Sequence, residues 1–197
     1  MQVSHWLVRR AVRTATRQMF ARVTRNVIEE ALPQVKATLF EEFGMVVEDR
    51  ILGCGAHGCV LPIKGTQFVV KITDDRSEYD ASTVSRRIKH PALPQVKAAL
   101  QVGPHMYAIV RENLMPLSGG DESRVTDYGS EYLDALMRNQ TPPTPTERGL
   151  PELEPVVDAI KSLDAAGCFV FDLHGPNVLR RPNGAWVFAD LGASDCG

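Results

Sequence analysis

The chain of 197 residues lacks the features that define several large protein classes. No apolar run approaches the roughly 20 residues that a membrane-spanning helix requires. The N-terminal MQVSHWLVRR carries its charges after its apolar residues, which is unlike a secretory signal. A net charge of −2 gives no overall preference for nucleic acid. These absences predict a cytoplasmic protein without a transmembrane segment.

The cysteines also lack a pattern. Cys54, Cys59, Cys168 and Cys196 form no CxxC pair and have no clustered histidine partners, so a structural zinc site is not expected. Reduced thiols are the expectation for a cytoplasmic chain. An apolar content of 44% is enough for a buried core, and the length indicates one domain or two small lobes.

Residues 1–43 differ in character from the rest. Six arginines precede the first acid, Glu29, and apolar residues recur among them at helical spacing. The spacing predicts an amphipathic helix with a kink or restart at Pro33. We expect it to dock on the body of the protein, with its arginines in water; a membrane-surface arm, a nucleic-acid arm and a cleaved targeting peptide are the alternatives. The apolar face consists of Val8, Val12, Ala15, Met19 and Val23.

Residues 51–60 read ILGCGAHGCV, a G-x-G-x-x-G-x-V pattern. Dinucleotide-binding folds share such glycines but need a helix directly after them. Here β-prone residues follow, and a Lys64-Gly65 turn leads to a second strand at 67–72. The order of strand, glycine-rich turn and strand lets main chain cover phosphates without side-chain clashes. The patterned residues are Gly53, Gly55, Gly58 and Val60.

The stretch 169–192, FVFDLHGPNVLRRPNGAWVFADLG, holds two acids and an amide around a hairpin. Strands at 178–180 and 185–189 are expected, joined by an Asn-Gly turn with the positive φ values of a tight hairpin. The hairpin would bring Asp190 beside Asn177, and a short strand would deliver Asp172. A proton acceptor and two oxygen ligands for Mg²⁺ are the groups required for in-line phosphoryl transfer.

These residues resemble the protein-kinase-like superfamily. D-L-H-G-P-N at 172–177 and D-L-G at 190–192 look like its catalytic loop and its metal-binding D-F-G, in a form closer to aminoglycoside and choline kinases and atypical protein kinases. The resemblance implies that Asp172 orients or deprotonates the acceptor and that Asn177 and Asp190 hold Mg²⁺. His174 stands where protein kinases carry a lysine that steadies the transferred phosphoryl group.

The resemblance covers about residues 44–197 and implies an ATP site in the first half as well. Lys71 resembles the V-A-I-K lysine that contacts the α- and β-phosphates, and Glu78, on a helix at 77–88, is its expected ion-pair partner. Main chain at Glu112 and Leu114 falls where a kinase hinge contacts adenine. ATP is expected between two lobes, under the glycine turn.

The implied fold is α+β and two-lobed. An N-terminal helical extension at 1–43 would precede a small lobe at 44–112, with about five antiparallel strands and one helix, and a reduced helical lobe at 113–197. Further helices are expected at 126–139 and at 154–166, the second beneath the catalytic loop. A proline-rich connector at 141–146 is expected to be extended and unpacked.

The sequence also departs from the family. Val170 and Phe171 replace the His and Arg of H-R-D, so control by activation-loop phosphorylation is not expected. Five residues follow Gly192, without the helices that bind peptide in protein kinases, and a truncated or accessory form fits this. An ATP- and Mg²⁺-dependent Ser/Thr protein phosphotransferase is the leading hypothesis. A pseudokinase-like partner-binding module and a small-molecule kinase are the alternatives.

Overall fold

The computed structural model describes residues 28–170, 172–192 and 194–196. They form two compact units: one contains the described residues up to Arg76 with Leu100–Val110, and the other contains Ser77–Ala99 with the described residues from Arg111 onward. The chain mixes helices and strands, which confirms a mixed α and β structure, compatible with the predicted α+β class. The two-lobed kinase arrangement and the domain limits at 43 and 112 stay predictions.

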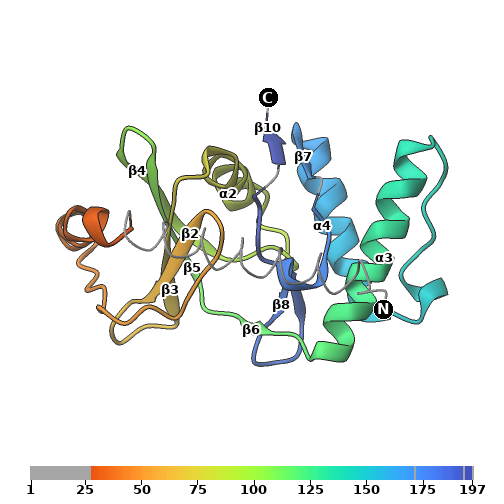
Figure 1. The fold of residues 1–197 in the computed structure, drawn as a ribbon, viewed down its shortest axis with the longest axis horizontal. Coiled ribbons are helices and arrows are strands. Elements are labelled where there is room, and N and C mark those ends of the chain that lie inside the picture. The colour runs from red at the N-terminus through yellow and green to blue at the C-terminus, as the bar shows by residue number, and fades with distance from the viewer. Residues whose placement is uncertain (1–27, 171, 193, 197) are drawn as a thin grey trace, which may run out of the picture. The chain divides into compact units, whose positions relative to one another are not determined.

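Figure 1 shows the elements along the chain. The strands are β1 (Gly53–Cys54), β2 (Gly58–Pro62), β3 (Phe68–Thr73), β4 (Val96–Gly103), β5 (Met106–Glu112), β6 (Met115–Pro116), β7 (Cys168–Val170), β8 (Val178–Arg180), β9 (Trp186–Phe188) and β10 (Ser194–Cys196). The helices are α2 (Arg76–Ile88), α3 (Gly119–Met137) and α4 (Glu154–Ala165), with the 3-10 turns η1 (Thr146–Arg148), η2 (Pro151–Leu153) and η3 (Gly175–Asn177). Residues 28–43 are also helical.

The first unit is built on β1, β2 and β3 and on the parts of β4 and β5 within Leu100–Val110, which belong to a sheet with the strand order β1-β2-β3-β5-β4. Strands β1, β2 and β3 pair antiparallel, with Val60 opposite Lys71. Leu61 of β2 and Val70 and Ile72 of β3 are fully buried. Because a strand and not a helix follows Gly58, this region lacks the geometry of a dinucleotide-binding turn.

The helix at 28–43 belongs to the same unit and is amphipathic. Ile28, Val35 and Leu39 are buried at helical spacing, while Phe40 is exposed. The helix continues without a break through the exposed Pro33, which removes one main-chain donor but does not restart the helix. The predicted docking residues Val8, Val12, Ala15 and Met19, and Val23 of the same apolar face, lie outside the described residues.

The second unit packs helices on short strands around its own core. Helix α4 contacts β7 and β9, and α3 contacts η3. The helix predicted at 154–166 therefore supports the strands beside the loop, and α3 contacts the loop itself. The predicted hairpin is present as β8 and β9, but of its turn residues only Gly184 has a positive φ, of 89°. Asn183 contributes a side-chain oxygen that accepts the Ala185 N–H at 3.1 Å.

The expectation of reduced thiols is wrong in this structure. Cys54 is bonded to Cys59 and Cys168 to Cys196. Each pair lies directly opposite on neighbouring antiparallel strands, β1 with β2 and β7 with β10, which brings the sulfur atoms together. Disulfides are typical of oxidising compartments, so the cytoplasmic location stays a prediction.

Two further expectations need correction. Helix α3 begins at Gly119, earlier than predicted, because the Ser118 side chain accepts the Asp121 N–H and caps the first turn. The proline-rich connector is packed and not free, since Pro145 is buried and the Tyr128 hydroxyl donates to the Pro143 carbonyl at 2.9 Å. No helix within the described residues is long and apolar enough to cross a membrane.

Candidate functional site

The loop that follows β7 carries the first predicted acid. Asp172 is half-buried and lies two residues beyond the end of β7. The Asn177 side-chain amide donates to the Asp172 carbonyl oxygen at 2.9 Å and to its carboxylate at 3.0 Å. This double contact closes the loop between the two residues and fixes the direction of the carboxylate.

The second acid returns to the same place through the β8–β9 hairpin. The Asn177 main-chain carbonyl accepts the Ala189 N–H at 2.7 Å and the Asp190 N–H at 3.4 Å, continuing the ladder of the hairpin. The Asp190 carboxylate accepts the Gly192 N–H at 3.2 Å. The structure therefore brings Asp172, Asn177 and Asp190 together, with Asn177 contacting both acids.

His174 approaches the first acid. Its Nδ1 atom lies 3.1 Å from the Asp172 carboxylate. The angle is unsuitable for a hydrogen bond, and this buried atom has no hydrogen-bond partner in the described part of the chain. His174 thus adds a basic group beside Asp172 without fixing it in place.

Helix α3 supports this loop by one hydrogen bond and two close approaches that the sequence pattern did not indicate. The Gly175 N–H donates to the Thr126 hydroxyl at 2.9 Å. A Cβ atom on Gly129 would lie 1.7 Å from the Leu173 carbonyl oxygen, and one on Gly175 would lie 2.1 Å from the Glu122 carbonyl oxygen. Gly129, in the first turn of the helix predicted at 126–139, was the one available signal, because glycine has a low helix propensity and can mark close packing.

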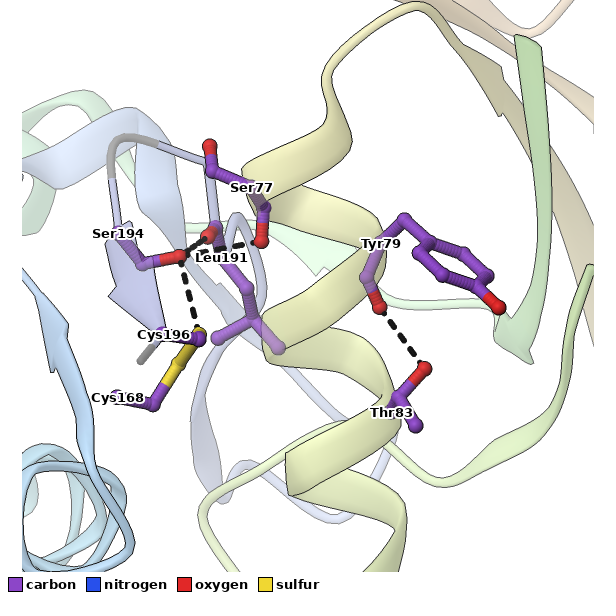
Figure 2. Close-up of a disulfide and its surroundings, with 7 residues drawn as sticks. All are labelled: Ser77, Tyr79, Thr83, Cys168, Leu191, Ser194 and Cys196. Atoms are coloured by element: carbon purple, nitrogen blue, oxygen red, sulfur yellow. Dashed lines mark hydrogen bonds between the residues drawn. A yellow bond between two sulfur atoms is a disulfide. The ribbon is translucent and has the colours of Figure 1, made fainter. Parts of the chain in front are cut away.

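The segment after Asp190 is also tied down. Strand β10 pairs antiparallel with β7, and the Cys168–Cys196 disulfide joins the two strands. The Ser194 hydroxyl lies within hydrogen-bond distance of the Leu191 carbonyl at 2.8 Å and of the Ser77 carbonyl at 3.2 Å, as Figure 2 shows. We call Asp172 and Asp190 the acid pair. The chain segments before and after this pair are therefore anchored to each other.

Glu78 has a cationic neighbour that was not predicted. It is 1% exposed, and its carboxylate lies 3.9 Å from the Arg111 guanidinium. The same guanidinium donates to the carbonyl of Ala189, the residue before Asp190. Arg111 thus connects α2 to the acid pair. The predicted pairing of Glu78 with Lys71 involves residues of different units and stays a prediction.

In the first unit, the glycine turn is held by main chain. The Gly55 N–H donates to the Gly58 carbonyl at 2.8 Å, and the His57 carbonyl accepts from Asp74 and from the Thr73 hydroxyl. A Cβ on Gly58 would lie 2.4 Å from the Ile72 carbonyl oxygen, whereas Gly53 has open space around it. Lys71, opposite Val60, is 8% exposed.

The predicted hinge is occupied by structural contacts. The Glu112 N–H donates to the Gln95 carbonyl at 3.0 Å, and the Glu112 carboxylate accepts from Arg181 at 2.6 and 2.9 Å. Glu112 could therefore offer adenine only its carbonyl oxygen. Leu114 follows two residues later, and its role also stays a prediction.

No three His, Cys, Asp or Glu side chains within the described ranges are grouped so as to hold a metal ion. The predicted ligands are one carboxylate, of Asp190, and one amide, of Asn177. Mg²⁺ commonly takes one or two protein oxygens and completes its shell with water and phosphate. The Asn177 amide nitrogen is directed to Asp172, which leaves its oxygen for another partner, so this donor set fits Mg²⁺.

Comparison with protein-family models and with curated protein sequences finds no match. Any assignment of function therefore rests on the residues and their geometry.

Proposed function

We propose that the protein is an ATP- and Mg²⁺-dependent phosphotransferase that acts on Ser or Thr hydroxyls of proteins. The observation that carries the proposal is the double role of Asn177, whose side chain holds Asp172 while its carbonyl accepts the Asp190 N–H. Asn177 thus holds one carboxylate through its side chain and keeps the main chain of a second acid close by. In-line phosphoryl transfer requires such groups, because catalysis depends on positioning and on electrostatic stabilisation.

In this proposal, Asp190 and Asn177 hold Mg²⁺, which would neutralise charge on the phosphates. Asp172 orients the acceptor hydroxyl and takes its proton. His174 lies beside Asp172 and would steady the transferred group when protonated. Gly53, Gly55 and Gly58 with Val60 would cover the ATP phosphates, and Lys71 would clamp them. Glu112 and Leu114 would offer main-chain atoms to adenine.

The test separates binding from chemistry. Asp172→Asn keeps the shape of the side chain but removes the proton acceptor, so transfer should fall by a factor on the order of 10² while affinity for ATP stays nearly constant. Asp190→Ala should weaken Mg·ATP binding and abolish transfer together. Lys71→Ala should lower both to an intermediate degree. Incorporation of radiolabelled phosphate into a generic protein acceptor measures transfer, and thermal shift with Mg·ATP measures binding.

The matched control is Asp195→Asn, which removes an exposed carboxylate from β10 outside the acid pair. It should leave both readouts unchanged. Wild-type transfer rates in Asp172→Asn would remove Asp172 from the mechanism. Stabilisation by Mg·ATP with no transfer in the wild type would instead favour a pseudokinase-like module, and transfer to a small molecule only would favour a small-molecule kinase.

A further inference from the structure

A cavity of about 380 Å³ lies in the second unit and is lined by none of the candidate site residues. Its walls come from the end of α2, the segment that follows, the start of β4 and one residue beyond β8. No acidic residue lines it within the described chain. The basic lining residues are Arg86, Lys89, His90, Lys97 and Arg181.

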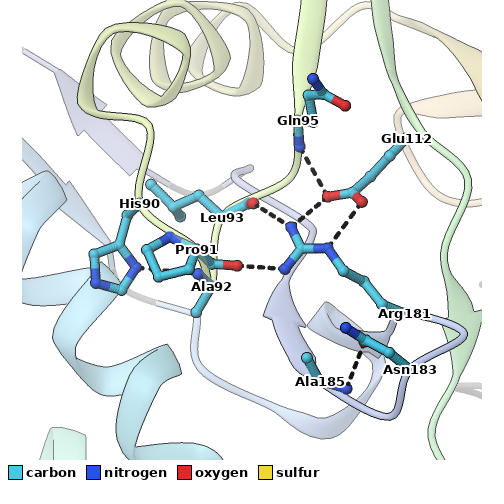
Figure 3. Close-up of polar contacts among 9 residues, drawn as sticks. All are labelled: His90, Pro91, Ala92, Leu93, Gln95, Glu112, Arg181, Asn183 and Ala185. Atoms are coloured by element: carbon cyan, nitrogen blue, oxygen red, sulfur yellow. Dashed lines mark hydrogen bonds and ion pairs between the residues drawn. The ribbon is translucent and has the colours of Figure 1, made fainter.

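Arg181 forms a fixed wall of this cavity. Its guanidinium makes two hydrogen bonds to the Glu112 carboxylate and also donates to the Pro91 and Leu93 carbonyls, as Figure 3 shows. This ion pair compensates the charge of Arg181. His90 is fixed as well, because its Nδ1 atom accepts the Ala92 N–H at 3.1 Å.

Two other cations of the cavity are not compensated in this way. Arg86 and Lys89 are exposed, and neither has an ion-pair partner among the residues described. Cations are favoured at the C-terminal end of any helix, and this accounts for both in part. Lys97 reaches the same cavity from β4.

Ser85 supplies an independent observation. Its side chain is 2% exposed and lines the cavity, and its hydroxyl oxygen is buried with no hydrogen-bond partner in the described chain. A buried polar group without a partner is costly and rare in native proteins. A ligand with acceptor oxygens in this cavity would satisfy the hydroxyl.

The backbone conformation of Lys89 is a further unusual feature of this cavity. Lys89 has a φ of 56° directly after the last residue of α2, a left-handed position where glycine is strongly preferred. A lysine there is strained relative to glycine. Lys89 thus places a cation, in a strained conformation, at the edge of a cavity with an unsatisfied hydroxyl.

We propose that this cavity binds a phosphate group carried on a larger molecule, a phosphomonoester such as a phosphorylated serine side chain. Arg86, Lys89 and Lys97 supply positive charge, and Ser85 supplies a neutral donor, a combination that suits an anion with several acceptor oxygens. A phosphate group fills only a fraction of the cavity, which leaves room for the group that carries it. The proposal does not depend on phosphotransferase activity.

The experiment is isothermal titration of the whole protein, without nucleotide, using O-phosphoserine, serine and inorganic phosphate. O-phosphoserine should bind, and serine should not. Tighter binding of O-phosphoserine than of inorganic phosphate supports a carried phosphate, and equal affinity supports the same site for the free ion. Indistinguishable titrations of O-phosphoserine and serine would overturn the proposal.

Two variants, Lys89→Gly and Ser85→Ala, with Arg87→Ala as the control, distinguish a specific binding site from general surface charge. Lys89→Gly should weaken binding of O-phosphoserine about tenfold while raising the melting temperature, because glycine relieves the left-handed strain. Ser85→Ala should also weaken binding about tenfold without lowering the melting temperature. Arg87→Ala removes an equal charge from the same turn outside the cavity and should change affinity less than twofold. Equal losses in Arg87→Ala and Lys89→Gly, with none in Ser85→Ala, would refute the site.

Discussion

The glycine turn of the first unit and the acid loop of the second are positioned by different means. The turn is set by main-chain hydrogen bonds and strand register, and a Cβ atom added at Gly53 or Gly55 would meet nothing within 4 Å beyond its chain neighbours. The loop that carries Asp172 is held by the Asn177 side chain, by the pairing of β10 with β7, and by the close approach of α3 at Gly129. Gly53 and Gly55 should therefore tolerate an added side chain that Gly129 does not, whereas Gly58 should not, because its Cβ would lie 2.4 Å from the Ile72 carbonyl oxygen.

The largest effect on stability is expected from the Cys168–Cys196 disulfide. Its cysteines are separated by 28 residues in sequence, and the loop that they close contains Asp172 and Asp190. In the chain-entropy description, replacing both cysteines by alanine should lower the free energy of unfolding by about 3.5 kcal/mol. Urea unfolding of the non-reduced protein measures this. Hydrogen exchange should show the loss of protection concentrated in the second unit, and a loss confined to the first unit would contradict the comparison.

Gly129→Ala tests the close approach of α3 to the loop. The added Cβ would meet the Leu173 carbonyl oxygen, so helix or loop must shift, and we expect a loss of about 3 kcal/mol. Urea unfolding measures the loss. Gly53→Ala, with open space around it, is the matched control and should change stability by less than about 0.5 kcal/mol. Similar losses in both variants would show that the two regions are equally sensitive.

The contrast between the locally determined glycine turn and the loop held by tertiary contacts explains which features the sequence could predict. Glycines that permit a turn are recognisable from neighbouring β-prone residues, so the order of β1, β2 and β3 and the β8–β9 hairpin could be predicted. Gly129 serves packing between elements far apart in sequence, and no local pattern identifies its partner. Strand β10 is only three residues long, too short for a periodic signal.

The contacts of the candidate site also divide into those predictable from local turn chemistry and those that depend on tertiary packing. The closeness of Asn177 and Asp190 followed from a hairpin of known turn chemistry. The contact of Arg111 with Glu78 did not, because a buried ion pair between a strand and a helix depends on tertiary packing alone. Both disulfides were missed for this reason as well, since pairing of cysteines depends on strand register that the spacing does not contain.

The smaller disulfide gives a milder test in the first unit. Cys54 and Cys59 are separated by 5 residues, and the strands they join are already paired. Replacing both by alanine should cost about 2 kcal/mol in the chain-entropy description, less than for the larger loop. Urea unfolding in parallel with the Cys168 and Cys196 double variant gives the ranking, and a reversed order would mean that the turn depends on its cross-link more than on its register.

The smallest expected effect concerns Tyr128, which pins the proline-rich connector to α3 beside Gly129. Burial, followed by the neighbouring Tyr132 phenol and nearby carboxylates, raises the pKa of Tyr128 well above its usual 10.0, and burial, followed by Asp164, raises that of Tyr132. Above about pH 10 the phenols of the unfolded chain ionise more readily than these two do in the folded protein. The unfolded state then holds fewer protons, so stability is fully present below pH 10 and falls as pH rises toward the folded-state values.

Tyr128→Phe should therefore have two signatures. At neutral pH it loses the hydrogen bond to the Pro143 carbonyl, at a cost of about 1 kcal/mol. Between about pH 10 and 11.5 its stability should fall less steeply than that of the wild type, because one of the two late-titrating phenols is gone. Urea unfolding across this range, with absorbance titration of the tyrosines, measures both. An unchanged slope would mean that the Tyr128 phenol ionises in the folded protein as it does in the unfolded chain, and that the connector does not shield it from water.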